Sequence, residues 1–244
     1  MFVFFATLLL VGAPFASAFV ASSTNYRIQT DSINVGGVLS TSTSYRVEDT
    51  LGESGVGTSS SATYQIKAGY QQMQQGYIAI SSPGNITLLP SILSTGGGTG
   101  DGSAIWTVTT DNAAGYTMNL GASASPALTS GANNFVNYVP AGADPDFTFT
   151  TPAASSRFGF TPEGADIVQK YKDNGAVCNV GGLDTGSACW TALSTTPDTI
   201  VTRATPNHPS GTPTTVRFRA VSGAANVQPV GSYTATATLT VLPQ

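Results

Sequence analysis

Few residues of this chain have the types and spacing that enzyme chemistry requires. The single histidine, His208, lies between Asn207 and Pro209 in a proline-rich stretch. A serine hydrolase places its histidine between a nucleophile and an acid, and the sequence contains no Gly-x-Ser-x-Gly segment that would supply the nucleophile. We therefore expect His208 to be a solvated loop residue.

Paired carboxylates are the next source of acid–base chemistry, because a glycosidase needs only two of them. Glu48, Asp49 and Glu53 cluster in one segment, which is predicted to be exposed and has no aromatic wall to raise the pKa of an acid. We interpret the cluster as a charged outward face that keeps a strand soluble. No catalytic residue is assigned, and we expect no enzymatic activity.

Four further aspartates, Asp101, Asp111, Asp144 and Asp146, lie in predicted loops. Loops rich in carboxylates can hold calcium in extracellular sandwiches, but the Asp-x-Asp-x-Asp-Gly spacing of a calcium loop is absent. The lone histidine and two cysteines also leave a transition metal without a ligand set. We assign no metal site and no cofactor.

The only cysteines are Cys178 and Cys189. A disulfide between them would close a loop of about ten residues and fits an exported protein. Metal ligation is the alternative, although two cysteines without a nearby histidine are half a zinc site at most. We predict the disulfide.

The two tryptophans, Trp106 and Trp190, are the candidate binding residues. Together with Tyr116, Tyr138 and Tyr171 they could form a platform on which sugar rings stack. Aromatic residues on alternating strands also belong to a core, and Trp190 follows Cys189 and could cover the disulfide. Both readings remain open at the level of sequence.

Composition narrows the class of protein. Only 9% of the 244 residues are charged, the net charge is -4, and the nine basic residues are scattered. Phosphate binding needs clustered lysine and arginine, so nucleic acid is excluded as an expected partner. The 41% of hydrophobic residues suffice for a core.

The first 18 residues read as a secretory signal peptide. Residues 2–11 form an apolar run that is too short to span a bilayer, and Pro14 interrupts it before the small residues Ala16, Ser17 and Ala18. Cleavage after Ala18 would leave a secreted, extracellular or cell-surface protein. We expect no transmembrane segment in the mature chain.

Residues 19–76 contain an internal repeat. Tyr26, Tyr45 and Tyr64 are spaced by 19 residues, and Ser40 and Ser59 keep the same spacing. Three strand-like units joined by Gly and Ser turns are predicted, each too short to bury its own core. A domain junction is placed in the glutamine-rich segment at the end of this region.

Residues 77–244 predict an all-β fold, an antiparallel β-sandwich. Strand-like segments separated by Gly, Pro, Asn and Asp clusters are typical of this architecture. The predicted strands are 77–80, 85–89, 104–110, 116–120, 147–150, 158–160, 216–220 and 231–242. The glycine-rich stretch 96–102 is expected to be a mobile loop, and 163–173 to be the single short helix, because Ile167, Val168 and Tyr171 have helical spacing.

Two segments resemble WxL-type bacterial cell-surface domains. The first is 105–109 with 115–118 after its turn, and the second is the closing strand 231–241. At the positions of the family's Trp-x-Leu motifs this chain has Trp106-Thr107-Val108 and Leu239-Thr240-Val241. The resemblance implies a secreted β-rich domain that associates non-covalently with the cell wall. The N-terminal repeat resembles Ser/Tyr repeats of uncharacterised exported bacterial proteins.

These observations favour an exported structural or adhesive β-sandwich protein of the cell surface, with the envelope or other surface proteins as partners. One alternative is a pilin-like subunit that self-associates by strand donation, in which apolar residues of 19–26 complete the sheet of a neighbour. Another alternative is a carbohydrate-binding module that recognises glycans through Trp106 or Trp190.

Overall fold

The computed structural model describes residues 39–41, 46–48, 57–60, 65–69, 77–81 and 83–244. The chain divides into two compact units, Met1–Gln75 and Gly76–Gln244. The predicted signal peptide, the first repeat unit and the residues Tyr26, Tyr45, Tyr64, Asp49 and Glu53 lie outside the described residues.

The described part of the first unit consists of two short hairpins. Strand β1 (Leu39–Thr41) pairs with β2 (Arg46–Glu48), and β3 (Gly57–Ser60) pairs with β4 (Gln65–Ala68), both antiparallel. Ser40 faces Val47 in the first hairpin, and Ser59 faces Ile66 in the second. Each residue of the first pair lies 19 positions before its counterpart in the second pair, so the strand register repeats with the same period as the sequence.

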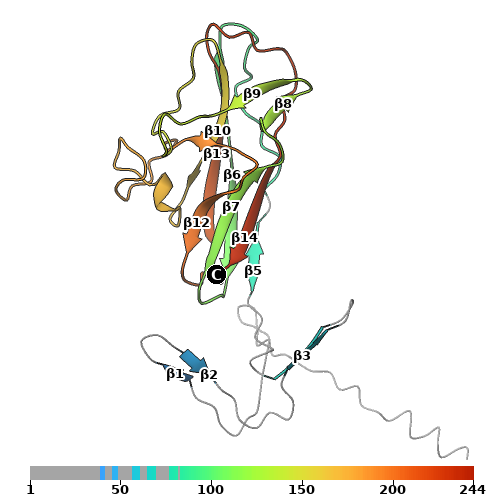
Figure 1. Ribbon diagram of the computed structural model, residues 1–244, viewed down its shortest axis with the longest axis vertical. Coiled ribbons are helices and arrows are strands. Elements are labelled where there is room, and N and C mark those ends of the chain that lie inside the picture. Colours follow the sequence, from blue (N-terminus) through green and yellow to red (C-terminus); the bar gives the residue numbers. More distant parts are fainter. Residues whose placement is uncertain (1–38, 42–45, 49–56, 61–64, 70–76, 82) are drawn as a thin grey trace, which may run out of the picture. The chain divides into compact units, whose positions relative to one another are not determined.

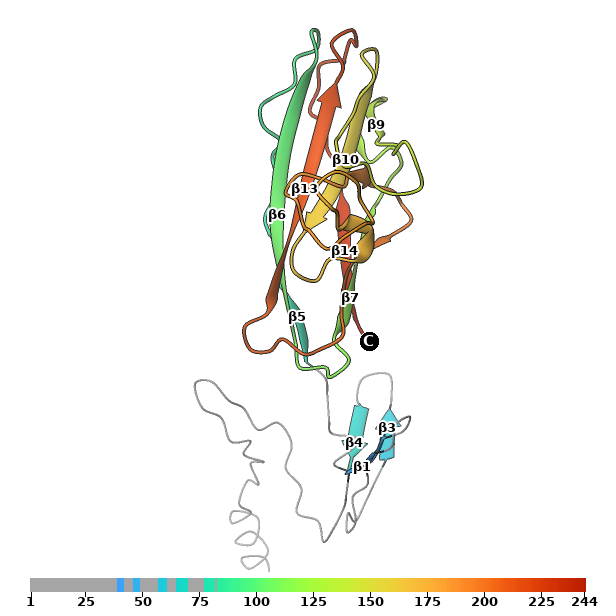
Figure 2. The ribbon, with the colours of Figure 1, turned by 90° about the vertical axis from the view of Figure 1, so that its left-hand side faces the viewer.

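The larger sheet of the second unit is built around two long neighbours, β6 (Gly98–Thr110) and β13 (Thr212–Ser222), which pair antiparallel over their length. The strand order is β5-β6-β13-β10-β9-β8, and β11 also pairs with β10. The remaining members are β5 (Ile78–Ile80), β8 (Leu128–Ser130), β9 (Asn133–Asn137), β10 (Ser156–Glu163) and β11 (Thr191–Ala192). Strands β6, β13 and β10 lie side by side in Figure 2. All pairs of this sheet are antiparallel except β9 with β10.

The smaller sheet has the order β12-β7-β14, formed by β12 (Asp198–Arg203), β7 (Tyr116–Ala122) and β14 (Ala237–Pro243). Figure 1 shows it against the larger sheet. The facing sides of the two sheets contribute one hydrophobic core, whose fully buried members include Met118 and Leu120 on β7, Phe160 on β10 and Val216 on β13. The all-β sandwich fold is therefore confirmed.

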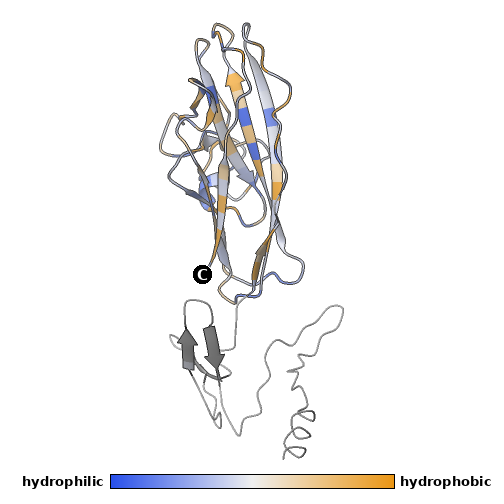
Figure 3. Ribbon diagram, turned by 90° about the vertical axis from the view of Figure 1, so that its right-hand side faces the viewer, coloured by the Kyte–Doolittle hydropathy of each residue, from blue (hydrophilic) through white to orange (hydrophobic). Residues whose placement is uncertain are grey.

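The alternation that predicted the strands continues in their burial. Along β13, Val216, Phe218 and Ala220 are buried, whereas Arg217 and Arg219 point to the other face. Figure 3 shows the hydrophilic bands that interrupt the long strands. Since successive side chains of a strand point to opposite faces, one face of β13 serves the core and the other is free for polar contacts.

The prediction of a mobile loop at 96–102 was wrong, because Gly98, Gly100 and Gly102 lie within β6. A Cβ atom on Gly102 would stand 2.7 Å from Cγ2 of Ile86, and one on Gly100 would stand 3.1 Å from the carbonyl oxygen of Pro90. The segment containing Ile86 and Leu88, predicted as a strand, is irregular and lies over this end of β6. Glycine is needed at positions 100 and 102 because this segment lies too close to the β6 backbone for a side chain to fit between them.

The predicted helix at 163–173 was also wrong. Glu163 ends β10, and only the single 3₁₀ turn η1 (Gln169–Tyr171) is helical. Ile167 instead forms a β-bridge with Val201, and the Val168 amide donates to the carbonyl oxygen of Ile200. The helical spacing of Ile167, Val168 and Tyr171 therefore belongs to a segment that runs extended beside β12 and then makes a single turn.

Residues 147–150, predicted as a strand, form an irregular segment beside the isolated bridge between Asp146 and Trp190. The alternating Phe147 and Phe149 are each half-buried. Within the described ranges, the structure contains no helix long and apolar enough to cross a membrane.

Candidate functional site

The outward face of β10 is covered by a layer of loops. Gly159 lies on that face, and a Cβ atom added to it would stand 2.8 Å from Cβ of Tyr138 and 3.2 Å from Cε2 of Phe149. Phe149 in turn makes an edge contact with Trp190, with ring centroids 5.3 Å apart. We call Tyr138, Phe149 and Trp190 the outer aromatic cluster. It forms a second packing layer, on the opposite face of the sheet from the sandwich core.

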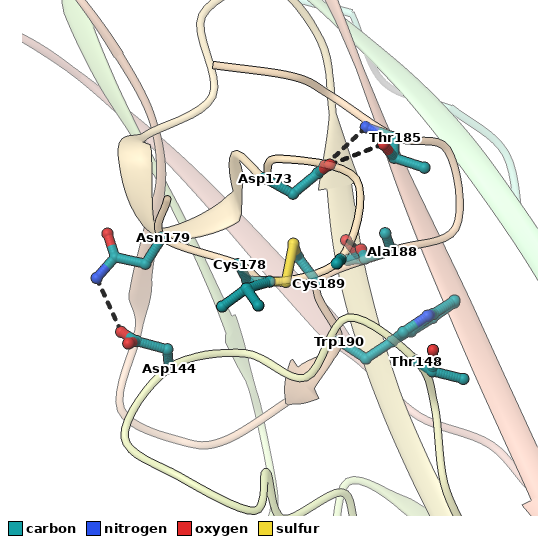
Figure 4. The surroundings of a disulfide bond; sticks show 12 residues. Asp144, Thr148, Asp173, Cys178, Asn179, Thr185, Ala188, Cys189 and Trp190 are labelled. Atoms are coloured by element: carbon teal, nitrogen blue, oxygen red, sulfur yellow. Dashed lines mark hydrogen bonds between the residues drawn. A yellow bond between two sulfur atoms is a disulfide. The ribbon is translucent and has the colours of Figure 1, made fainter. Parts of the chain in front are cut away.

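A disulfide links Cys178 and Cys189, and the predicted pairing is confirmed (Figure 4). Both cysteines pack with the sandwich core, and the loop between them reaches the outward face at Ser187. Their Cα atoms are 5.6 Å apart, and both residues are buried. Asn179, Ser187 and Cys189 have positive φ values of 62°, 59° and 61°. Such values are uncommon outside glycine, so the loop is held in a costly backbone conformation that its cross-link and contacts must maintain.

The carboxylate of Asp173 organises the same loop. It is fully buried and accepts hydrogen bonds from the Gly175 amide at 2.7 Å, the Thr185 amide at 2.9 Å and the Thr185 hydroxyl at 2.8 Å. Burial by itself raises the pKa of a carboxyl group, but the hydrogen bonds from Thr185 and Gly175 favour the charged form, and the pKa of Asp173 is lowered. Asp173 is therefore a charged structural acceptor, one that sequence reasoning missed.

Charged side chains continue the outer face beyond the aromatic cluster. Arg219 lies over the ring of Trp190 at 4.6 Å from its centroid and donates its Nε–H to Asp101 at 2.6 Å. Arg217, two residues earlier on β13, donates its Nε–H to Glu163 at 2.5 Å. The Ser187 amide donates to the same oxygen of Glu163 at 2.7 Å, so the disulfide loop and β13 meet at this carboxylate.

These side chains border an open hollow of about 240 Å³. We call it the outer hollow; its lining residues are Asp101, Gly102, Ser103, Ser187, Arg217 and Arg219. Sequence reasoning did not assign it, although the alternation of Arg217 and Arg219 with apolar residues already indicated that both arginines share the outward face. The hollow offers guanidinium, hydroxyl and carboxylate groups, a set suited to hydrogen-bonding a ligand.

The two candidate tryptophans lie on different faces of the larger sheet. Trp190 is 1% exposed and donates its Nε1–H to the carbonyl oxygen of Ser187 at 2.8 Å. Trp106 is half-buried on the inward face of β6, where it packs against the sandwich core. The structure therefore does not bring them together, and Trp190 presents no ring face on which a sugar could stack.

The remaining candidates serve local contacts. His208 is exposed in the turn before β13, with its ring edge-on to Tyr77 at 5.6 Å between centroids. Asp111 accepts the Tyr77 amide at 2.6 Å, Asp146 accepts the Tyr138 hydroxyl at 2.6 Å, and Asp144 accepts from Asn179 at 2.9 Å. Across the described ranges, no three His, Cys, Asp or Glu side chains gather as a metal site would require.

Comparison of the chain with protein-family models, with curated proteins and with solved structures found no match.

Proposed function

We propose that the protein is an exported, non-enzymatic β-sandwich protein of the cell surface with a structural or adhesive role. The observation that carries the proposal is the Cys178–Cys189 disulfide, whose two cysteines are buried. Disulfides persist in oxidising compartments outside the cytosol, so a fold whose loop layer depends on one suits an exported protein.

The use of the polar side chains supports a structural role. Asp173 holds the disulfide loop, Glu163 joins that loop to β13, and Asp146 holds Tyr138 of the outer aromatic cluster. These carboxylates accept hydrogen bonds from their own chain. They stabilise loops on a rigid sheet, as a durable surface protein requires.

Fractionation of the producing cells tests the proposal. We expect the mature protein to begin at Phe19, to be accessible to protease added to intact cells, and to resist thiol alkylation at Cys178 and Cys189. Release from the envelope by concentrated salt or denaturant would support the non-covalent association that the WxL-like segments imply. An intracellular full-length chain with two alkylatable cysteines would contradict the proposal.

A second candidate function, a subunit of a filament built by strand donation, is favoured by the position of β14. This strand is last in the order β12-β7-β14, and its inward residues Ala237, Leu239 and Val241 are only half-buried. Residues 19–26 of a neighbouring copy are the proposed donor strand, because main-chain pairing at an open sheet edge gives affinity. Deleting residues 19–23 should then abolish filaments without stopping secretion. Monomers alone at high concentration, measured by light scattering, would rule this candidate out.

A further inference from the structure

The outer hollow contains hydrogen-bond donors whose positions are fixed in advance. Arg219 is held on three sides: by Asp101, by the ring of Trp190 and by the ring of Phe149, which lies 5.9 Å from the guanidinium carbon. Arg217 is anchored through its Nε–H to Glu163. Preorganised side chains lose less entropy on binding, so they are more effective ligand contacts than free surface arginines.

Donor capacity remains after these contacts. Among the hydrogen bonds of the described residues, Arg217 uses only its Nε–H, and its side chain is 41% exposed. A guanidinium group has five N–H donors, so both Nη groups of Arg217 remain for a ligand. The exposed hydroxyl groups of Ser103 and Ser187 line the same hollow and can donate or accept.

Charge balance separates the candidate ligand classes. Two positive side chains, Arg217 and Arg219, are paired with two negative ones, Glu163 and Asp101. An anion entering the hollow would gain from the arginines but would be repelled by Asp101, which also lines it and is 49% exposed at its side chain. Alternating donors and acceptors with no net charge match the hydroxyl groups of a neutral sugar, each of which both donates and accepts.

We propose that the outer hollow is a binding site for a neutral carbohydrate, held by hydrogen bonds from Arg217, Ser103 and Ser187 and to Asp101. Its volume of about 240 Å³ is below the range of roughly 300–1,000 Å³ for sites that enclose a drug-sized ligand. One saccharide unit therefore enters, and a longer glycan continues into solvent. The idea that this sugar is what an adhesive surface protein recognises rests on the proposed function. Sugar binding by the hollow does not depend on that function.

The proposal is tested with the purified, oxidised protein carrying Trp106→Phe, in which Trp190 is the sole tryptophan. Because Arg219 lies over the Trp190 ring, occupation of the hollow should change the fluorescence of that tryptophan. The probes are maltose, cellobiose, lactose and the N-acetylglucosamine disaccharide, with glucuronate and inorganic phosphate as anionic probes. We expect a saturable change with at least one neutral disaccharide and none with the anions.

Two variants locate the site. Arg217→Gln removes both Nη groups and shortens the side chain, and it should weaken sugar binding at least tenfold. Ser103→Leu fills the hollow without touching an ion pair and should weaken it at least as much. The matched control is Arg157→Gln on β10, whose guanidinium donates to the carbonyl oxygen of Asn137 outside the hollow, and it should leave binding unchanged. Thermal unfolding of each variant verifies that it is folded.

Three results would overturn the proposal: saturation by none of the disaccharides, saturation only by the anions, or binding that both hollow variants retain at full strength. Because the measurement uses purified protein, it is independent of cell fractionation. A protein that binds sugar but stays in the cytosol would contradict the proposed function alone, and a surface protein that binds none would contradict this site alone.

Discussion

The two faces of strand β10 are buried in different ways. Its inward residues Phe158 and Phe160 join the apolar core between the sheets. Its outward residues Gly159 and Thr161 lie under the loop layer, where the Thr161 hydroxyl donates to the carbonyl oxygen of Ala188. The inward layer is made by apolar burial, whereas the outward layer combines aromatic contacts and ion pairs with a loop that the disulfide and the buried carboxylate of Asp173 hold in place.

One sheet therefore supports two kinds of packing. The inward layer follows from strand alternation, because burying apolar surface is non-directional and tolerates exchange among similar side chains. The outward layer depends on individual hydrogen bonds, each of which has one geometry. We therefore expect the inward layer to set the global stability, and the outward layer to fail locally when one of its specific contacts is removed.

The largest effect should come from the inward layer. Phe160 is fully buried, so Phe160→Ala should reduce the free energy of unfolding by about 4 kcal/mol through lost burial and the cavity it leaves. Urea unfolding measures this loss. Thr240→Ala, at an exposed position on β14, is the control and should stay within about 0.5 kcal/mol of the parent. Equal losses for the two variants would show that the core assignment is wrong.

Removing the disulfide should have the next largest effect. The cysteines are 11 positions apart in the sequence. The double variant Cys178→Ser, Cys189→Ser should lose about 3 kcal/mol of unfolding free energy, because the cross-link restricts the unfolded chain. Urea unfolding of the oxidised parent and of the variant gives the difference. A variant as stable as the parent would contradict the role assigned to the cross-link in holding this loop.

The buried carboxylate gives the outward layer a pH dependence. Because the pKa of Asp173 is lowered below its ordinary value of 3.8, its stabilisation is fully present above that pH and is lost as the pH falls through the lower folded-state pKa. At pH 7, Asp173→Asn should cost about 2 kcal/mol, since an amide group cannot accept all three hydrogen bonds. Urea unfolding measured between pH 7 and pH 2 should show that the difference in unfolding free energy between parent and variant becomes smaller in acid.

Asp144→Asn is the control for that experiment, because Asp144 is exposed and accepts one bond from Asn179. It should follow the parent at every pH. If the difference in unfolding free energy between parent and Asp173→Asn grew larger in acid, the pH dependence would be opposite to the one that the lowered pKa predicts.

The smallest expected effect is that of a substitution where the segment containing Ile86 and Leu88 packs closely on β6. Gly102→Ala should cost about 1.5 kcal/mol, because the new methyl group would meet Ile86 and Leu88 at 2.7 and 2.9 Å and force them aside. Gly84→Ala is the matched control, since no atom lies within 4 Å of the Cβ position there. Thermal unfolding compares the two. If both variants match the parent, the segment above β6 yields more easily than its packing indicates.

The sequence was sufficient for the parts of the fold that follow alternation. Segments 104–110, 116–120, 216–220 and 231–242 predicted strands, and each contains or overlaps one, because a half-buried strand must alternate. The failures occur where a second partner decides the conformation. The glycines of β6 have no side chains to alternate, and their strand conformation follows from the segment that lies over them.

The site was less predictable than the fold. Ile167, Val168 and Tyr171 had helical spacing, but the bridge to Val201 kept the segment extended before η1. The disulfide could be predicted because the chain has only two cysteines and its N-terminus predicts export to an oxidising compartment. The burial of Asp173 and the meeting of Glu163 with Arg217, 54 residues apart, depend on tertiary contacts that no local pattern encodes.

The most direct test of two separate layers is amide hydrogen exchange before and after reduction of the disulfide. The amides of Trp190 and Asp146, which donate to each other's carbonyl oxygens, report on the outward layer. Those of Asn119 and Thr240, which lie opposite each other at hydrogen-bonded positions of the β7–β14 ladder, report on the smaller sheet of the sandwich. We predict a larger acceleration of exchange after reduction at the first pair than at the second, because the first pair adjoins the loop that the disulfide holds and the second responds only to the lost global stability. An equal increase at all four, or no change at any, would contradict the account.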